Sequence, residues 1–177
     1  NNKKNKSISD LTIEEIESEK KILDKYYFRD SEVCGLNDKW LYDTFLPLIG
    51  DANKKAGWNW IIDTAEMFQF AIYHGKKEDG GFYGWHIDGS SDFNSALKPA
   101  IRINDKPLRK ISMTINLSDP NNYEGGNLKF DLGPHVKERY KICNEIRPQG
   151  SVIVFPSFMY HCVTPVTSGT RYSLVLW

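Results

Sequence analysis

The chain has 177 residues, of which 23 are Lys or Arg and 23 are Asp or Glu, so its formal net charge is zero. This length suits one domain with a full hydrophobic core. The balanced charge argues against non-specific binding to nucleic acid or an anionic membrane, because phosphate contacts need clustered positive charge. The three cysteines form no CxxC pair, which argues against a zinc knuckle or a disulfide framework. They favour a reducing compartment, the cytoplasm, or the host cytoplasm if the source is viral.

The first third of the chain has a helical pattern. We expect residues 1–9 to be disordered and residues 10–57 to support a core formed by residues 58–177, all in a single domain. Thr12 followed by Glu15 fits a capping box, which predicts a helix from there to about Tyr27. A second helix is predicted over residues 37–53, where apolar side chains recur at helical spacing: Trp40, Leu41, Phe45, Leu48 and Ile49.

Beyond Gly57 the segments become short, aromatic and β-branched. We predict strands at 58–63, 66–74, 82–87, 109–117, 126–131, 140–147, 150–155, 159–163 and 170–176. Within 111–117, apolar and polar residues alternate, which predicts one buried face and one polar face. Residues 89–108 carry no period; we expect them to form a lid together with 76–81. The order of elements predicts an α+β, mainly β protein: a double-stranded β-helix (jelly roll) core with N-terminal helices packed on one face.

A possible metal site begins with two residues in the predicted strand 82–87 and its end. Residues two apart on a strand project from the same face, so His86 and Asp88 can bind one metal together. His161, at the start of a later strand, can supply the third ligand. Two histidines and one carboxylate form the facial triad of non-haem Fe(II) oxygenases, which leaves one side of the metal open.

A second group follows His161 and fits an organic acid. A keto diacid needs its distal carboxylate held, and an arginine such as Arg171 can do this bidentately. Ser173 lies two residues further on, faces the same side of that strand and can donate a second hydrogen bond. We expect the other basic side chains near the middle of the chain to be solvated: Arg102, Lys106, Arg109 and Lys110.

These motifs resemble the Fe(II)- and 2-oxoglutarate-dependent oxygenases, in particular the prolyl 4-hydroxylase-like, PKHD-type hydroxylases of bacteria and phages. The resemblance runs from about residue 29 to 177. It rests on FQFAIY at 68–73, FYGWHID at 82–88, YEGGNL at 123–128, GSVIVFP at 150–156 and VTPV at 163–166, together with His161, Gly169, Arg171 and Ser173. The linker at 76–81 is longer than is usual in that family.

The resemblance implies a role for each matching position. His86, Asp88 and His161 match the iron ligands, and Arg171 matches the basic residue that pairs with the C5 carboxylate of 2-oxoglutarate. The further residues that it places at the cosubstrate are Ser173, Tyr73, Tyr83 and Thr164. The implied reaction consumes O2, releases succinate and CO2, and hydroxylates an unactivated C–H bond, with ascorbate as a reductant.

Several functions share such a site. The resemblance favours a peptide or protein substrate with proline as the target residue, and the alternative is a free amino acid or small metabolite. A nucleic-acid demethylase of the AlkB-like kind should carry a second arginine six residues after Arg171, where this chain has Trp177. A non-catalytic jelly-roll binding module should have lost a ligand or the arginine, and all four residues are present.

Overall fold

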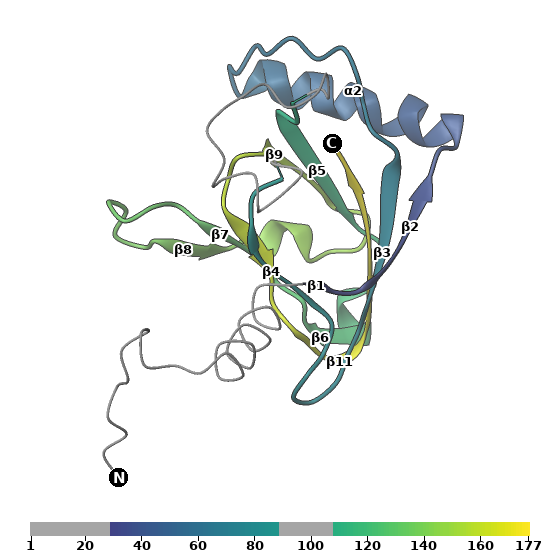
Figure 1. Cartoon of the computed structure of the whole chain (residues 1–177), viewed down its shortest axis with the longest axis vertical. Coiled ribbons are helices and arrows are strands. Elements are labelled where there is room, and N and C mark those ends of the chain that lie inside the picture. Colours follow the sequence, from purple (N-terminus) through teal and green to yellow (C-terminus); the bar gives the residue numbers. More distant parts are fainter. Residues whose placement is uncertain (1–28, 89–107) are drawn as a thin grey trace, which may run out of the picture.

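A computed structural model describes residues 29–88 and 108–177 of the chain (Figure 1). Within these ranges the elements follow in chain order: β1 (Arg29–Asp30), β2 (Glu32–Leu36), α2 (Lys39–Lys55), β3 (Phe68–His74), β4 (Phe82–His86), β5 (Ile111–Asn116), η3 (Pro120–Asn122), β6 (Tyr123–Gly125), β7 (Leu128–Asp131), β8 (Tyr140–Ile142), η4 (Asn144–Ile146), β9 (Val152–Pro156), β10 (His161–Val163) and β11 (Val166–Leu176). Among the described residues, no helix is both long and apolar enough to cross a bilayer.

The strands form two antiparallel sheets that face each other. The larger sheet has the order β2-β3-β11-β5-β9, with β6 paired to β11, and the smaller sheet has the order β1-β4-β10-β7-β8. Many neighbours in the sheets are distant in sequence; β11 at the end of the chain lies between β3 and β5. The jelly-roll fold and the mainly β class predicted from the sequence are confirmed.

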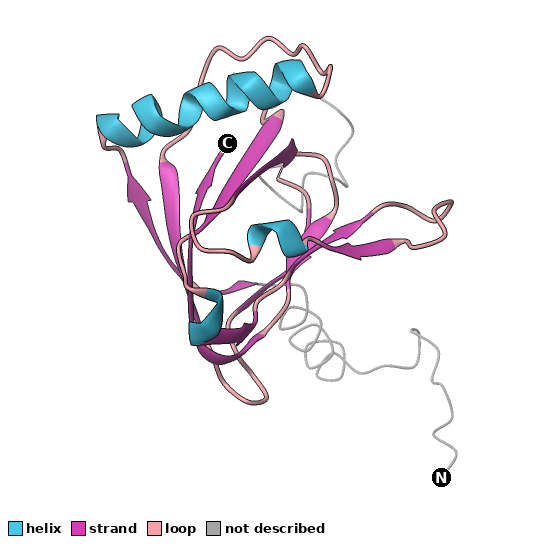
Figure 2. Ribbon diagram, turned by 180° about the vertical axis from the view of Figure 1, so that it is seen from behind, coloured by secondary structure: helices cyan, strands magenta, loops and turns pink. Residues whose placement is uncertain are grey.

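Helix α2 covers the outer face of the larger sheet (Figure 2). Leu41 and Ile49 of the helix are buried against apolar residues of β3, β5 and β11: Phe68, Ile111, Met113, Ile115, Leu174 and Leu176. The predicted helix is therefore present, although it begins and ends two residues later than expected, and Pro47 lies inside it. This apolar layer fixes which face of the larger sheet turns away from the helix and toward the smaller sheet.

The inner face of the larger sheet is polar and buried. Ser112, Thr114 and Asn116 of β5 alternate with the apolar residues that meet α2, and they are 0%, 8% and 0% exposed. On β11, Arg171 and Ser173 share this face, since Ser173 is the register partner of Asn116. The predicted alternation in β5 is correct. Its polar side faces the space between the sheets, and both sides are buried.

The structure corrects three predictions about the elements. Residues 58–63 form no strand: the side chain of Asn53 holds both backbone polar groups of Trp60, and Asn59 has a left-handed φ of 52°. Residues 29–36, expected within the helical support, form β1 and β2. Residues 144–146, expected in a strand, form the short helix η4. The predicted helix from Thr12 and all but the last residue of the predicted lid at 89–108 lie outside the described residues.

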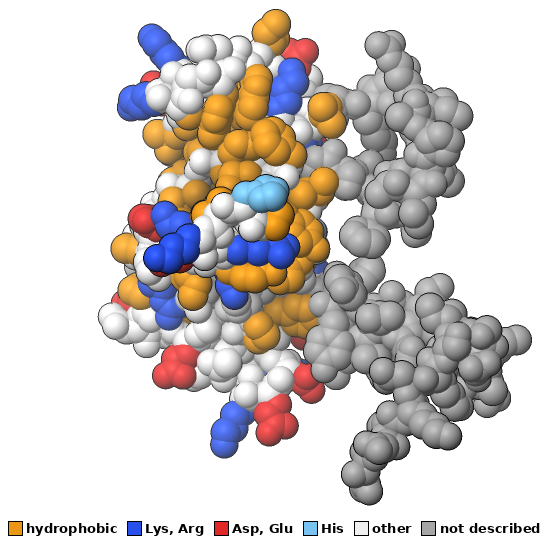
Figure 3. Space-filling model, turned by 90° about the vertical axis from the view of Figure 1, so that its left-hand side faces the viewer, with side chains coloured by type: hydrophobic (Ala, Val, Ile, Leu, Met, Phe, Trp, Pro, Cys, Tyr) orange, Lys and Arg blue, Asp and Glu red, His pale blue; other side chains and the backbone are white. Residues whose placement is uncertain are grey.

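Strands β7 and β8 form a hairpin that extends away from the rest of the molecule (Figure 1). The face that carries it combines apolar side chains with Lys and Arg (Figure 3). Its exposed apolar residues are Leu132, Val136, Tyr140 and Ile142. Lys129 and Arg139 both lie over the Tyr140 ring, so this surface mixes cations with an aromatic side chain.

Where β11 begins, backbone segments approach too closely for a side chain. Gly169 has φ +71°, and a Cβ there would lie 1.9 Å from the carbonyl oxygen of Asn122. Gly133, in the β7–β8 hairpin, has φ +92°, and a Cβ added there would meet no atom within 4 Å. The two glycines therefore share a backbone conformation, and only Gly169 has the close contact.

We predict that Gly169→Ala lowers the free energy of unfolding by about 2 kcal/mol more than Gly133→Ala, because both carry the left-handed strain and only the first adds a backbone collision. Urea denaturation of the two variants measures the difference. Equal losses would mean that the close approach at Gly169 is relieved without energetic consequence.

Candidate metal and cosubstrate site

Three side chains that can bind a metal converge between the two sheets. His86 ends β4, Asp88 follows two residues later, and His161 begins β10. The Nε2 atoms of His86 and His161 each lie 3.5 Å from a carboxylate oxygen of Asp88, and one ligand atom from each residue falls within 4.8 Å of the others. In the register of the smaller sheet His161 is the partner of His86, which brings together two residues 75 positions apart in the chain.

Both histidines present the same nitrogen to the centre of this group. The Nδ1 of His86 donates to the carbonyl oxygen of Gly84 at 2.7 Å, and the Nδ1 of His161 donates to that of Met159 at 2.8 Å. A carbonyl oxygen can only accept, so each Nδ1 carries a proton, and in the neutral imidazole Nε2 keeps a lone pair. This is the tautomer that a metal-binding imidazole requires.

Asp88 is buried and held as a carboxylate by its neighbours. Its backbone N–H donates to the carbonyl oxygen of Ser157, and its Oδ2 accepts from the Ser112 hydroxyl at 2.7 Å. Burial by itself raises the pKa of this carboxyl. The neighbouring His86 and His161 side chains and the hydrogen bond from Ser112 outweigh burial and bring the pKa to about 2. The residue is therefore ionised and available as an anionic ligand at neutral pH.

His161, in contrast to Asp88, is held in its neutral form. Burial, and to a lesser extent the neighbouring His86, lower the pKa of its imidazole to about 4, and Asp88 acts in the opposite direction. A neutral imidazole is the form that binds a metal. The ring also lies against Phe155, at 4.9 Å between centroids, so an apolar wall restricts its rotation.

Arg171 lies on the inner face of β11, 2% exposed, with its guanidinium 5.5 Å from the centroid of the Tyr73 ring. Gly126 makes room for it, because a Cβ at that position would lie 2.8 Å from Cδ of Arg171. Among the described residues, its buried Nη1 has no hydrogen-bond partner. A buried guanidinium N–H without an acceptor is destabilising, and a carboxylate supplies the acceptor that this group lacks.

The other residues predicted at the cosubstrate divide into two groups. Tyr73 is the register partner of Arg171, Ser173 follows on the same inner face, and both are buried. Tyr83 packs with the cluster that contains Tyr73, and its ring stacks on that of His86 at 3.6 Å.

Thr164 has a structural partner instead: its Oγ1 accepts the backbone N–H of Asn127. It lines a cavity of about 580 Å³ together with residues that include Trp85, Lys129 and Cys162.

A bulge in β4 accounts for the position of Tyr83. Tyr83 and His86 pair with Val163 and His161, so three steps along β4 match two along β10. In a regular strand, residues three apart face opposite sides; the extra residue returns Tyr83 to the face of His86.

Several residues at the site escaped the sequence analysis. Arg109, expected to be solvated, pairs with Glu66 at 2.5 Å, stacks on Trp177 at 4.0 Å and reaches the carbonyl oxygen of Asp88 at 3.4 Å. Nε1 of Trp177 is buried and has no partner within the described part of the chain. Glu66 and Arg109 are 43 residues apart, so no local pattern signals their pairing.

Residues 68–177 match the family model of the 2OG-Fe(II) oxygenase superfamily, which is more than half of the chain. The chain belongs to this superfamily. Oxygenases of the superfamily use Fe(II), 2-oxoglutarate and O2. The donor set fits these groups, since two neutral imidazoles and a carboxylate suit Fe(II), and the unpaired Arg171 nitrogen suits a carboxylate of 2-oxoglutarate.

Relatives with similar sequences are named PKHD-type hydroxylases. The one from Synechococcus sp. strain CC9605 is 37% identical over 102 residues, which are 58% of this chain and 38% of the relative. YbiX from Escherichia coli O6:K15:H31 is 35% identical over 107 residues, 58% of this chain and 40% of the relative. The chain thus spans less than half the length of these curated relatives.

Solved structures of prolyl hydroxylases share the fold of this oxygenase. A prolyl 4-hydroxylase from Pseudomonas putida has a TM-score of 0.57 and 21% identity, covering 85% of this chain and 72% of its own. A prolyl hydroxylase from Trichoplax adhaerens, in complex with a peptide fragment of the hypoxia inducible factor oxygen degradation domain, has a TM-score of 0.60 and 19% identity, covering 86% and 64%.

We predict that Ser112→Ala weakens Co(II) binding about tenfold, because the carboxylate of Asp88 loses the hydrogen bond that orients it. Co(II) replaces Fe(II) to avoid oxidation, and calorimetry measures its dissociation constant. Ser151→Ala, on the loop before β9, is the matched control. An unchanged Ser112→Ala dissociation constant would show that Asp88 is oriented by its backbone alone.

Proposed function

We propose that this chain carries the catalytic site of an Fe(II)- and 2-oxoglutarate-dependent dioxygenase that hydroxylates an unactivated C–H bond, with peptidyl proline as the target. The observation that carries the proposal is the pairing of two sites on the inner faces of the sheets. A metal-ligand triad lies at the ends of β4 and β10, and Arg171 on β11 faces the same interior with an unsatisfied nitrogen.

Each residue has a defined task in this proposal. His86 and His161 bind the metal through Nε2, and Asp88 adds the anionic oxygen, which together leave one side of the metal open. Arg171 binds the distal carboxylate of 2-oxoglutarate, with Ser173 and Tyr73 beside it on the inner face. When bound, the metal, 2-oxoglutarate and O2 supply the oxidising chemistry, and succinate and CO2 leave.

A peptide substrate is supported by features at the rim of this site. Arg109 lies between Glu66 and Trp177, in contact with the backbone of Asp88, and the indole N–H of Trp177 has no acceptor among the described residues. The Trp177 N–H is a donor that a peptide carbonyl oxygen would satisfy. The names of the PKHD-type relatives, and the peptide complex of the Trichoplax adhaerens enzyme, favour the same class of substrate.

We expect Arg171→Gln to raise the KM for 2-oxoglutarate about tenfold or more, because glutamine retains hydrogen bonds but not the charge that pairs with a carboxylate. Succinate formation measured against 2-oxoglutarate concentration gives KM and kcat. High 2-oxoglutarate should restore turnover in Arg171→Gln but not in His161→Ala. A KM equal to that of the parent would remove Arg171 from the cosubstrate site.

The substrate class is tested by a mass-spectrometric screen with Fe(II), 2-oxoglutarate and ascorbate as the reductant. Proline-containing peptides are compared with free proline and other free amino acids, and the product is recognised by the mass of one added oxygen atom. We expect hydroxylated peptide from the parent and none from Asp88→Ala. Hydroxylation of free amino acids alone would favour a small-metabolite hydroxylase and contradict the peptide assignment.

A further inference from the structure

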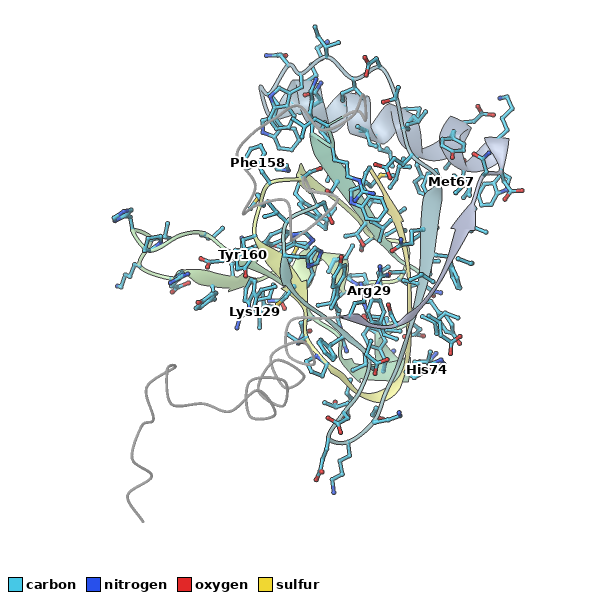
Figure 4. All side chains as sticks on the ribbon, viewed as in Figure 1. Arg29, Met67, His74, Lys129, Phe158 and Tyr160 are labelled. Carbon is cyan, nitrogen blue, oxygen red and sulfur yellow. The ribbon has the colours of Figure 1, made fainter. Side chains whose placement is uncertain are left out.

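Arg29 is held between the two sheets by contacts to both. It belongs to β1, where it is the register partner of Tyr83 on the smaller sheet. Its Nε donates to Ser31 Oγ and its Nη1 to Oε1 of Gln69, on β3 of the larger sheet, both at 2.5 Å. In the view of Figure 4, Arg29 lies nearer the centre of the molecule than the labelled His74. The guanidinium therefore has a fixed position.

The guanidinium begins a stack that ends at a metal-ligand candidate. Its Cζ lies 4.7 Å from the centroid of the Tyr83 ring. The Tyr83 ring is in turn stacked on the His86 imidazole, with centroids 3.6 Å apart and planes 16° from parallel. A cation at this distance from an aromatic ring is attracted to it. Arg29 thus contacts Tyr83, and Tyr83 contacts His86.

His86 has fewer constraints than the other histidine of the triad. Its side chain is 14% exposed, against 6% for His161, and the hydrogen bond that orients it goes to Gly84 inside the β4 bulge. His161 is also enclosed by Phe130 and Phe155. For His86, the Tyr83 ring is the aromatic surface that packs against the imidazole.

We propose that Arg29 is a positioning residue that holds Tyr83 against His86 and so keeps the imidazole in its metal-binding orientation. The inference rests on the proposed function, because it takes His86 as a ligand. It assigns Arg29 an effect on metal affinity that is transmitted through the Tyr83 ring, with no contact between Arg29 and the metal.

The test is the dissociation constant for Co(II), measured by calorimetry on the full chain without 2-oxoglutarate. We expect Arg29→Gln and Tyr83→Leu each to raise it about tenfold, in the range found when an outer partner of a metal ligand is removed. Tyr83→Phe should match the parent, since the ring remains, and Arg29→Lys should fall between, since the cation remains without the two-armed anchor. The double variant Arg29→Gln/Tyr83→Leu should bind no more weakly than Tyr83→Leu alone.

Arg139→Gln is the matched control. Arg139 also lies over a tyrosine, at 5.0 Å from the Tyr140 ring, and is anchored to Asp131, but it belongs to the β7–β8 hairpin. Its Co(II) dissociation constant should equal that of the parent. Thermal unfolding of the metal-free variants reports whether each folds, and Arg29→Lys keeps the test valid if Arg29→Gln does not.

Two results would overturn the proposal: parental affinity in Arg29→Gln, or effects of Arg29→Gln and Tyr83→Leu that add in the double variant. Asp88→Ala separates this failure from failure of the proposed function. If the parent binds Co(II) and Asp88→Ala does not, the triad stands whatever the Arg29 variants show. If Asp88→Ala binds as well as the parent, the triad and the role of Arg29 both fall.

Discussion

A carboxylate, two imidazoles and a guanidinium lie between two β-sheets. Protein groups must replace the water that these side chains would otherwise bind, and this requirement governs the arrangement around them. Asp88 remains charged because the Ser112 hydroxyl and two histidines contact its carboxylate. Its backbone N–H donates to the carbonyl oxygen of Ser157, which holds the residue in place. Removing such a charge from water is unfavourable unless partners replace the water. The polar inner face of β5 is therefore part of the site, since Ser112 bonds Asp88 and Asn116 lies opposite Ser173.

The same requirement explains why the fold needs both a helix layer and a second sheet. The apolar residues of β5 and β11 pack against α2, which provides the hydrophobic core. The polar residues of those strands can then face inward without removing apolar surface from that core. The larger sheet thus has the apolar cluster shared with α2 on one side and the candidate metal and cosubstrate residues on the side of the smaller sheet.

Sequence reasoning found those site residues whose relation is local. His86 and Asp88, or Arg171 and Ser173, are two apart, and strand alternation alone places each pair together. The sequence offers His161 as a third ligand only as a histidine at the start of a later strand, and the register of β10 against β4 places it beside His86. Glu66, Arg109 and Trp177 carry no local signal, and the role of Tyr83 depends on a bulge that alternation does not predict. Strands β1 and β2 were missed because they are short, with sequences RD and EVCGL that show no alternation of apolar and polar residues, and they pair with β4 and β3.

Strands β1 and β2 have a consequence for how the domain opens. Ser31 is the single residue between them, yet β1 is an edge of the smaller sheet and β2 an edge of the larger one. Separating the sheets at this edge must break the hydrogen bonds of one short strand or the other, because one residue of chain cannot span a widening gap. Detachment of β1 uncovers the edge of β4, and detachment of β2 uncovers the edge of β3. The segment matching the family begins at Phe68, but within the described residues the two sheets also include β1 and β2, which precede it in the chain.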